Sequence, residues 1–391
     1  MIETSRKKFH KKLKSKAIEN ARILNAFFEL TYGCNFSCRH CYIPSTDIEK
    51  TDVQIRSWRE ESGIAGKDEL RTEDVFRILD ILELGGCLEI TFTGGEPFLR
   101  EDIFRILEYA ARKGFRVRLS TNGSLITAEK AGRLKRLGVE EVAVTFNSPD
   151  RDTFDWFVRK KGAYEAVIKS MEDLSRYMGA FSIRSAFLTV NEEDIAEIRH
   201  IAIEKLGVPF RRINFITPQW DGSKRNLIYR LQPGRFRKVS KRIERDIEST
   251  AKENRTDNKT KKTKYIPPDP PSLYREDIFS CSAGVTNFVI NPYGEMRLCM
   301  DLPFPKYDLL NGSLNEGVAL LRAYRKECIR PEDYICTKCE LLPYCSSCPA
   351  RNYLECGRLN ACPPYYKRLA EIAKREIEEK HSYEIAGNNT R

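Results

Sequence analysis

Long apolar runs are absent from this sequence of 391 residues. No stretch reaches the roughly eighteen apolar residues that a membrane-spanning helix needs. The basic start, MIETSRKKFHKKLKSK, leads into no apolar core of the kind found in a secretion signal. We find no convincing internal repeat either. We therefore expect a cytoplasmic protein without a membrane partner.

Cysteine, by contrast, is abundant. The chain has 13 cysteines in a composition that is otherwise typical of a soluble globular protein, with 41% hydrophobic and 31% charged residues. Its length is sufficient for two domains and a substantial core. In a reducing cytoplasm, so many cysteines indicate metal ligands rather than disulfides.

The net charge of +11 is carried partly by two basic runs, residues 6–16 and 259–264. One interpretation is attraction to an acidic partner, such as a leader peptide or a nucleic acid. The other is that both runs are solvated tails and linkers. Neither run interleaves aromatic residues with its charges, so we favour the second interpretation and expect no nucleic-acid partner.

Three cysteines lie close together in the stretch ELTYGCNFSCRHCY, directly after an apolar run that resembles a strand. They are Cys34, Cys38 and Cys41, spaced C-x3-C-x2-C. Three thiolates at this spacing can hold three irons of a cubane [4Fe–4S] cluster and leave the fourth iron open to a small molecule. The alternatives are a zinc site or buried free cysteines, although zinc sites more often contain paired C-x2-C units.

Two glycine-containing motifs follow at the ends of expected strands, in LEITFTGGEPFLR and in FRVRLSTNG. Glycine at the end of a strand lets the backbone approach a ligand closely. Together with the cysteine triplet, these motifs resemble those of the radical S-adenosylmethionine (SAM) enzymes, in the same order and at similar separations. The resemblance implies a [4Fe–4S] cluster whose open iron binds the amino and carboxylate groups of SAM. One electron then cleaves SAM to methionine and a 5′-deoxyadenosyl radical, which abstracts hydrogen from the substrate.

The same resemblance implies which residues surround SAM. They are His40, Gly94, Gly95, Glu96, Asn122, Asn147 and Arg159. The two glycines and Glu96 are expected to bind the methionine amino group, His40 to pack near the adenine, and Arg159 to contact the carboxylate. Asn122 and Asn147 are expected to reach the ribose or the carboxylate. Arg159 can equally be a solvated charge at a helix end, and the asparagines can equally be turn residues.

Strand-like and helix-like segments alternate from residue 26 to about residue 254. The expected strands are residues 26–30, 88–93, 115–120, 139–146, 181–190 and 211–216, and the expected helices are residues 73–84, 102–113, 128–137, 164–178 and 192–206. Such alternation predicts an α/β fold with a parallel sheet and helical crossovers. The resemblance makes this a partial (β/α)6 TIM-like barrel, with the three motifs at the carboxyl ends of its strands.

The composition changes after the barrel. We divide the chain into a basic N-terminal segment (1–25), a radical SAM barrel (26–254), a charged and proline-rich linker (255–273), a cysteine-rich domain (274–375) and a tail (376–391). Nine of the 13 cysteines lie between residues 281 and 362. Alternating apolar residues around the sequence NPYG at 291–294 predict a β-hairpin.

The cysteine-rich domain resembles a SPASM domain, which carries two auxiliary [4Fe–4S] clusters. Cys281, Gly294 and Cys299 meet the family spacing, but only two residues precede Cys348 where the family has three. The resemblance implies that one cluster binds Cys281, Cys299 and Cys348, with an unclear fourth ligand for which Cys328 is the nearest spare. The alternative is a double zinc ribbon.

The second auxiliary cluster is expected on a C-x2-C-x5-C run and one late cysteine. These ligands are Cys336, Cys339, Cys345 and Cys362, the last suiting the gap better than Cys356. Asp301 is a candidate acid or base by analogy with sulfatase maturases, although Met300 separates it from the preceding cysteine. Cys87 has no such neighbours and is expected to pack as a small apolar residue.

Three functions remain open. The first is maturation of a ribosomally made peptide or protein, which is the usual role of SPASM enzymes. The second is chemistry on a small molecule such as a tetrapyrrole side chain, and the third is a non-catalytic iron–sulfur or zinc scaffold. The 25 residues before the first strand are too few for a domain that recognises a precursor peptide, and a separate partner protein could supply one. We also expect an electron donor such as a flavodoxin or ferredoxin.

Overall fold

The computed structural model describes residues 15–17, 22–213, 216–253, 278–279 and 281–388. The expected linker and most of the basic N-terminal segment lie outside these residues. Among the described residues, no helix is long and apolar enough to cross a membrane.

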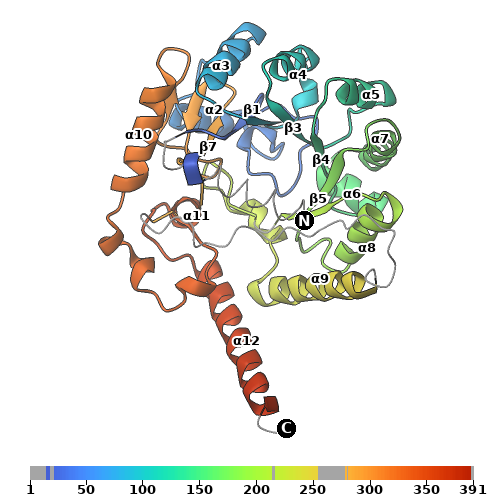
Figure 1. Cartoon of the computed structure of the whole chain (residues 1–391), viewed down its shortest axis with the longest axis vertical. Helices are drawn as coiled ribbons and strands as arrows, with labels where there is room; N and C mark the ends of the chain where they lie inside the picture. Colours follow the sequence, from blue (N-terminus) through green and yellow to red (C-terminus); the bar gives the residue numbers. More distant parts are fainter. Residues whose placement is uncertain (1–14, 18–21, 214–215, 254–277, 280, 389–391) are drawn as a thin grey trace.

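A nine-stranded sheet organises the molecule, in the order β6-β5-β4-β3-β2-β1-β7-β8-β9 (Figure 1). Its parallel part comprises β1 (Asn25–Glu29), β2 (Glu89–Thr93), β3 (Arg116–Thr121), β4 (Glu141–Thr145), β5 (Phe181–Ala186), β6 (Phe210–Ile213) and β7 (Asn287–Ile290). The antiparallel part is β8 (Glu295–Arg297) and β9 (Tyr307–Asp308). The expected α/β class with six parallel strand–helix units is confirmed.

The helices lie outside the curved sheet and on the C-terminal side of the molecule (Figure 1). They are α2 (Asp52–Glu61), α3 (Thr72–Leu84), α4 (Ile103–Arg112), α5 (Ala128–Arg136), α6 (Arg151–Val158), α7 (Ala163–Tyr177), α8 (Ile195–His200), α9 (Pro233–Glu253), α10 (Leu314–Glu327), α11 (Pro349–Cys356) and α12 (Pro364–Asn388). The sequence analysis did not identify α2, α6 or any helix after α8.

Periodic apolar side chains explain why the helices cover the strands. In α4 the buried residues include Ile103, Ile106, Leu107 and Ala110, spaced three to four apart, so that one face of the helix is apolar. They share one core cluster with residues of β2 such as Phe92. The other face of each strand is then free for polar groups inside the barrel, because successive side chains alternate.

Two expected boundaries were wrong. Strand β5 ends at Ala186 rather than at residue 190, because the Asn191 carboxamide accepts the N–H of Leu188 at 2.9 Å and closes a turn. The expected helix 192–206 consists of α8 followed by a π-helical turn, Ile201–Lys205.

The C-terminal region extends the same sheet. The expected hairpin is confirmed as β7 and β8, with Gly294 at φ +80° in its turn. Strand β7 pairs in parallel with β1, aligning Asn287 with Asn25. This pairing places the first C-terminal cysteines beside the strand that leads into the cysteine triplet. Helix α12 contacts α9 and then projects from the body of the molecule (Figure 1).

Candidate active site

The cysteine triplet lies in the loop that follows β1, at the carboxyl end of the parallel sheet. Gly94 and Gly95, which follow β2, pack against the chain just before Cys34. A Cβ on Gly94 would lie 2.2 Å from the Thr31 carbonyl oxygen, and one on Gly95 would lie 2.1 Å from that of Gly33. The Gly95 N–H donates to the same Thr31 oxygen at 2.8 Å. The glycines therefore hold the cysteine loop, and this N–H is already used within the chain.

Glu96 connects two of the motifs. Its carboxylate is fully buried and accepts hydrogen bonds from the N–H of Phe98 (3.0 Å), the N–H of Asn122 (2.8 Å) and the hydroxyl of Thr121 (2.9 Å). Burial raises the pKa of this carboxyl group. Glu96 thus joins the loop after β2 to the loop after β3 instead of pointing into open space.

Asn122 brings the loop after β3 to the first cysteine. Its side-chain N–H group donates to Asn35 at 2.8 Å and lies 3.8 Å from the Cys34 sulfur. The Asn35 amide in turn donates to the Ser124 hydroxyl at 2.9 Å. All three sequence motifs therefore meet within a few ångströms of Cys34.

The end of α6 supports the middle of the cysteine loop through backbone hydrogen bonds. The N–H of Ser37 donates to the Val158 carbonyl at 3.1 Å, and that of Arg39 donates to the Phe157 carbonyl at 3.0 Å. His40 stacks on Phe157 with its ring centroid 4.9 Å away. Burial lowers the pKa of His40 to about 4, so this imidazole is neutral at physiological pH.

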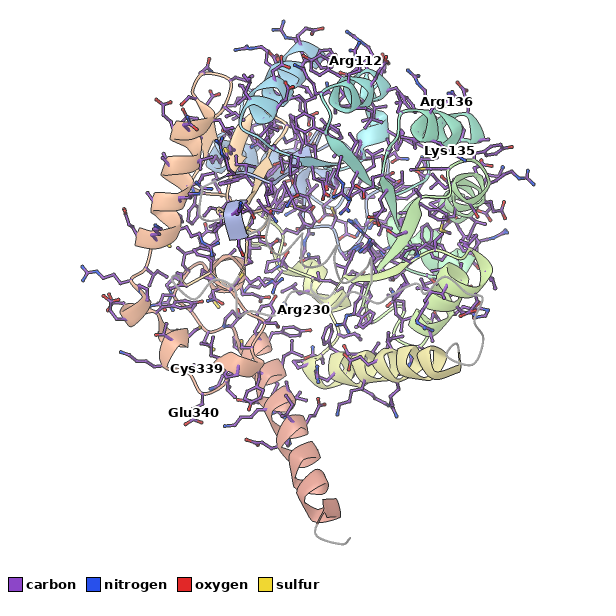
Figure 2. All side chains as sticks on the ribbon, in the orientation of Figure 1. Arg112, Lys135, Arg136, Arg230, Cys339 and Glu340 are labelled. Atoms are coloured by element: carbon purple, nitrogen blue, oxygen red, sulfur yellow. The ribbon has the colours of Figure 1, made fainter. Side chains whose placement is uncertain are left out.

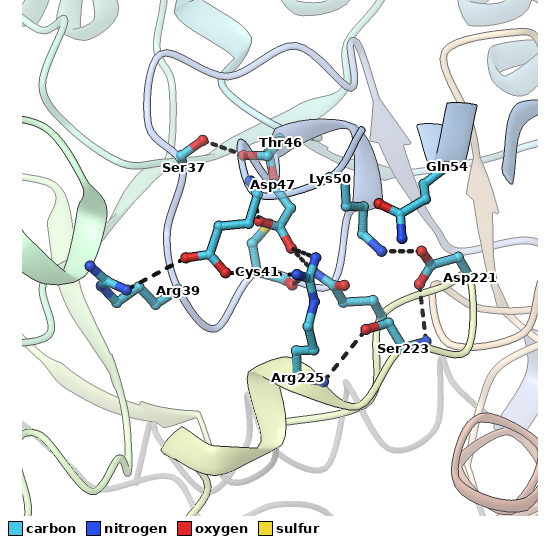
Figure 3. Close-up of polar contacts among 12 residues, drawn as sticks. Ser37, Arg39, Cys41, Thr46, Asp47, Lys50, Gln54, Asp221, Ser223 and Arg225 are labelled. Atoms are coloured by element: carbon cyan, nitrogen blue, oxygen red, sulfur yellow. Dashed lines mark hydrogen bonds and ion pairs between the residues drawn. The ribbon is translucent and has the colours of Figure 1, made fainter. Parts of the chain in front are cut away.

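A segment far along the chain, residues 217–226, closes over the other side of the loop (Figure 3). The Gln219 carboxamide donates to the Cys41 carbonyl at 3.2 Å, and the Asn226 carboxamide donates to the His40 carbonyl at 3.3 Å. Lys50 pairs with Asp221 in the same region (Figure 3). The cysteine loop is therefore held from both sides by other parts of the chain.

Arg159 points toward the loop from the end of α6. It adopts a left-handed conformation (φ 55°) and forms ion pairs with Asp47, at 3.2 Å, and with Glu49. Arg225 also pairs with Asp47, at 3.1 Å (Figure 3). Arg159 is thus a half-buried member of an ion-pair network and not a solvated helix-end charge.

Asn147 has a different position from the other expected SAM residues. It is buried at the end of β4, and its side-chain oxygen accepts the N–H of Ala186 at 2.9 Å and the hydroxyl of Ser185 at 3.3 Å. It therefore joins the ends of β4 and β5. No contact in the described part of the chain links it to the cysteine loop.

The three thiols of the triplet influence one another. Burial raises the pKa of Cys34 to about 11, with a further contribution from Cys41. Burial also raises the pKa of Cys38, and both other thiols add to this effect. Because metal ligation requires thiolates, three thiols held this close gain most from a bound cation that compensates their charge.

The surroundings of the triplet fit a cluster with a polar cosubstrate. Four buried polar atoms near the loop lack a hydrogen-bond partner among the described residues: His40 Nδ1, Ser45 Oγ, Gln219 Oε1 and Asn226 Oδ1. Within those residues, no three His, Cys, Asp or Glu side chains are arranged to hold a single metal ion. The thiolates of a cubane bind different irons, so they need not converge on one point.

The C-terminal thiols affect one another's pKa in two groups, which we call the first and second sets. In the first set, burial is the main cause that raises the pKa of Cys299. The nearby groups Asp301, Cys348 and Cys281 raise it further. Burial raises the pKa of Asp301 itself, against the opposing charge of Arg351. The thiol of Cys328 donates to the carbonyl of Arg325 at 3.9 Å, at the end of α10.

The second set consists of the remaining expected ligands. Burial raises the pKa of Cys336, and Cys345, Cys362 and Cys339 add to it in that order. Cys339 is exposed at the edge of the molecule, whereas Cys336 is half-buried (Figure 2). Cys87 lies elsewhere and is buried, with its thiol 3.4 Å from the Glu89 carbonyl oxygen, as expected for a packing residue.

A buried ion pair that the sequence analysis missed lies between the two regions. Glu29, the last residue of β1, pairs with Arg297, the last residue of β8, and both side chains are almost completely buried. The Tyr32 hydroxyl donates to Glu29 at 3.1 Å and accepts from Arg297 at 3.3 Å. Two features of the sequence could have indicated this ion pair. One is the single acidic residue in the apolar strand AFFEL, and the other is the arginine two residues before Cys299.

Comparison with known proteins defines the class of protein. Residues 28–202 match the family model of the radical SAM superfamily. The chain is 32% identical over 208 residues to an AdoMet-dependent heme synthase of Methanosarcina barkeri strain Fusaro, covering 53% of this chain and 54% of that protein. The chain thus spans about half the length of this relative.

Two further matches extend through the C-terminal region. The antilisterial bacteriocin subtilosin biosynthesis protein AlbA of Bacillus subtilis strain 168 is 26% identical over 364 residues, covering 90% of this chain and 72% of that protein. The fold matches that of Streptococcus suis SuiB bound to precursor peptide SuiA, with a TM-score of 0.63, 15% identity, and coverage of 89% and 77% of the two chains. The chain therefore contains a radical SAM domain followed by a SPASM-like extension.

Proposed function

We propose that this protein is a radical SAM maturase that abstracts hydrogen from a peptide or protein substrate. The observation that carries the proposal is the loop of Cys34, Cys38 and Cys41, which the chain itself holds at the carboxyl ends of the barrel strands. The match to a bacteriocin biosynthesis protein over 90% of the chain supports a peptide substrate. The fold shared with SuiB, whose structure contains a precursor peptide, agrees with this choice.

Specific residues would hold each cofactor. The triplet would bind the [4Fe–4S] cluster that supplies the electron for SAM cleavage to methionine and the 5′-deoxyadenosyl radical. Cys281, Cys299 and Cys348 would hold one auxiliary [4Fe–4S] cluster, with Cys328 as the candidate fourth ligand. Cys336, Cys339, Cys345 and Cys362 would hold the other. Thiolate is the ligand that iron–sulfur clusters prefer.

The chain's own residues would position the cosubstrate and keep water out. Neutral His40, stacked on Phe157, offers an unpaired buried nitrogen beside the triplet. Asn122, whose side-chain nitrogen lies 3.8 Å from the Cys34 sulfur, would contact a ligand bound beside that cysteine. Asp301, whose pKa burial raises, is the candidate acid or base near Cys299.

A second candidate substrate is a tetrapyrrole side chain. It is favoured by the 32% identity to the heme synthase, although that match covers only about half of each chain. The third alternative, a non-catalytic scaffold, would not cleave SAM at all.

One experiment separates these functions. The reconstituted protein is incubated without oxygen with SAM, a reductant, and either short peptides encoded near its gene or an iron coproporphyrin. A peptide mass loss of about two hydrogens, by the stoichiometry of an oxidative crosslink or thioether, supports the proposal. Alteration of the porphyrin alone would favour the tetrapyrrole substrate over the peptide. If no 5′-deoxyadenosine forms, only the non-catalytic scaffold remains.

A further inference from the structure

The outer side of the cysteine loop carries a surface hollow of about 470 Å³. It is lined by Arg39, Ile48, Glu49, Trp156, Lys160 and Lys161, among others. We name these six residues the loop patch. They come from the cysteine loop, from the segment just after it, and from the end of α6 with the residues that follow.

The loop patch is directly connected to the triplet. Arg39 lies between Cys38 and Cys41 in the sequence, and its guanidinium group lies 4.2 Å from the centre of the Trp156 ring. The Arg39 Nε–H also donates to the Trp156 carbonyl at 3.0 Å. Figure 3 shows Arg39 beside the cysteine loop, on the side away from Asp221 and Lys50. A molecule seated on the patch would therefore contact the same loop that carries the triplet.

The patch has the composition of a protein-binding surface. It includes two exposed apolar side chains, Ile48 with 71% and Trp156 with 47% of its surface accessible. Exposed apolar groups surrounded by charges are typical of interaction sites, and tryptophan and arginine are common at their energetic centres. A deep ligand cleft is not required for such a contact.

The charge of the patch is positive. Glu49 is already paired with Arg159, and the carboxylate of the neighbouring Asp155 accepts the N–H groups of Gly162 (2.6 Å) and Tyr164 (2.8 Å). Lys160 and Lys161 are exposed and form no ion pair with any described residue. The uncompensated lysines would attract an acidic partner and accelerate its association.

We propose that the loop patch is the docking surface for an acidic one-electron carrier protein of the flavin or iron–sulfur type. The inference rests on the proposed function, because SAM cleavage consumes an electron that this chain must receive from outside. In the docked complex the carrier loses one electron, the cluster bound by the triplet gains it, and no atom is transferred. The patch suits this step because it includes Arg39 of the cysteine loop and exposes apolar side chains among positive charges.

The test uses the full-length reconstituted protein and a purified acidic flavodoxin. The variant is Lys160→Glu with Lys161→Glu, two residues that take no part in the candidate active site. The control is Lys135→Glu with Arg136→Glu, which makes the same change of charge on α5, at the outer edge of the molecule (Figure 2). Flavodoxin binding is measured by calorimetry at low and at moderate salt, and 5′-deoxyadenosine is measured with flavodoxin and, separately, with dithionite as the reductant.

We expect the double variant to bind flavodoxin at least tenfold more weakly and to lose most of the salt dependence of binding. Flavodoxin-driven SAM cleavage should fall at least tenfold, whereas dithionite-driven cleavage and iron content should not change, and the α5 control should match the wild type. Equal loss in the control, wild-type binding by the variant, or weakened binding of an acidic peptide but not of flavodoxin would each overturn the inference. If the wild type cleaves no SAM even with dithionite, the proposed function fails, while the binding measurement still decides the docking surface.

Discussion

Gly94 combines two backbone constraints at the site, a positive φ and a close approach to the cysteine loop. Its φ of +131° is a conformation that side chains rarely tolerate, and a Cβ there would meet a backbone oxygen of the cysteine loop at 2.2 Å. A flexible side chain could move away from a new methyl group, but the Thr31 atom in contact is a backbone oxygen, which also accepts the N–H of Gly95. Gly94 and Gly95 thus pack against the protein's own cysteine loop.

Replacing Gly94 by alanine should therefore displace the loop. We expect a loss of about 2–4 kcal/mol in the free energy of unfolding, from strain and overpacking together, and less iron bound by the triplet. Gly114→Ala is the matched control, because Gly114 also has a positive φ (+82°) but no atom lies within 4 Å of the place that a methyl group would take there. Urea unfolding and iron analysis measure both effects, and equal losses in the two variants would contradict this explanation.

At the scale of the elements, a link between Arg100 and Asp102 fixes α4 against the cysteine loop. The Asp102 carboxylate accepts from Arg100 at 2.9 and 2.7 Å and from the Thr72 hydroxyl at 2.6 Å. Arg100 also donates to the carbonyls of Leu30 (3.2 Å) and Leu70 (2.8 Å). One ion pair thereby connects the starts of α3 and α4 with the end of β1.

This link predicts a dependence of stability on pH. Burial acts to raise the pKa of Asp102, but hydrogen bonds from Arg100 and Thr72 outweigh it, so the folded pKa lies below its ordinary value of 3.8. The stabilisation is then present above pH 3.8 and is lost as the pH falls through the folded pKa. Asp102→Asn should cost about 1–3 kcal/mol at pH 7, and the difference from wild type should shrink at the lowest pH values.

The control for Asp102 is Glu73→Gln. Glu73 pairs with Arg105 at 3.8 Å on the exposed surface, so its replacement should change the unfolding free energy by less than about 1 kcal/mol. Chemical unfolding of the three proteins across pH provides the comparison. A constant difference between Asp102→Asn and the wild type at every pH would contradict the assigned role.

The sequence predicted the parts of the site that depend on local order. Parallel strands end at one edge of a sheet, so motifs that follow successive strands must meet, and Cys34, Gly94 and Asn122 do so. Contacts between residues far apart in the sequence could not be predicted from this local order. The bonds from Gln219 to Cys41 and the pairing of β7 with β1 depend on closure of the fold, and Glu29 gained its partner Arg297 only through that pairing.

On the scale of the whole molecule, the triplet and the two C-terminal cysteine sets predict three separate cluster sites. Four irons in each cubane give about twelve irons per chain. Replacing Cys336 and Cys339 by alanine should remove about four of them and leave the triplet's cluster in place, because we expect those thiols to hold a different cluster. Iron and sulfide analysis under anaerobic conditions checks this. A wild-type value near four irons, or zinc in place of iron, would favour the zinc-ribbon interpretation of the C-terminal region.

The most direct test of the central claim is SAM cleavage by the reconstituted protein with dithionite and no added substrate. We expect 5′-deoxyadenosine and methionine in equal amounts. We also expect that replacing Cys34, Cys38 and Cys41 together by alanine abolishes both products while about eight irons remain bound to the C-terminal cysteines. Cleavage of SAM by this triple variant, or no cleavage by a wild-type protein with its full complement of iron, would contradict the account.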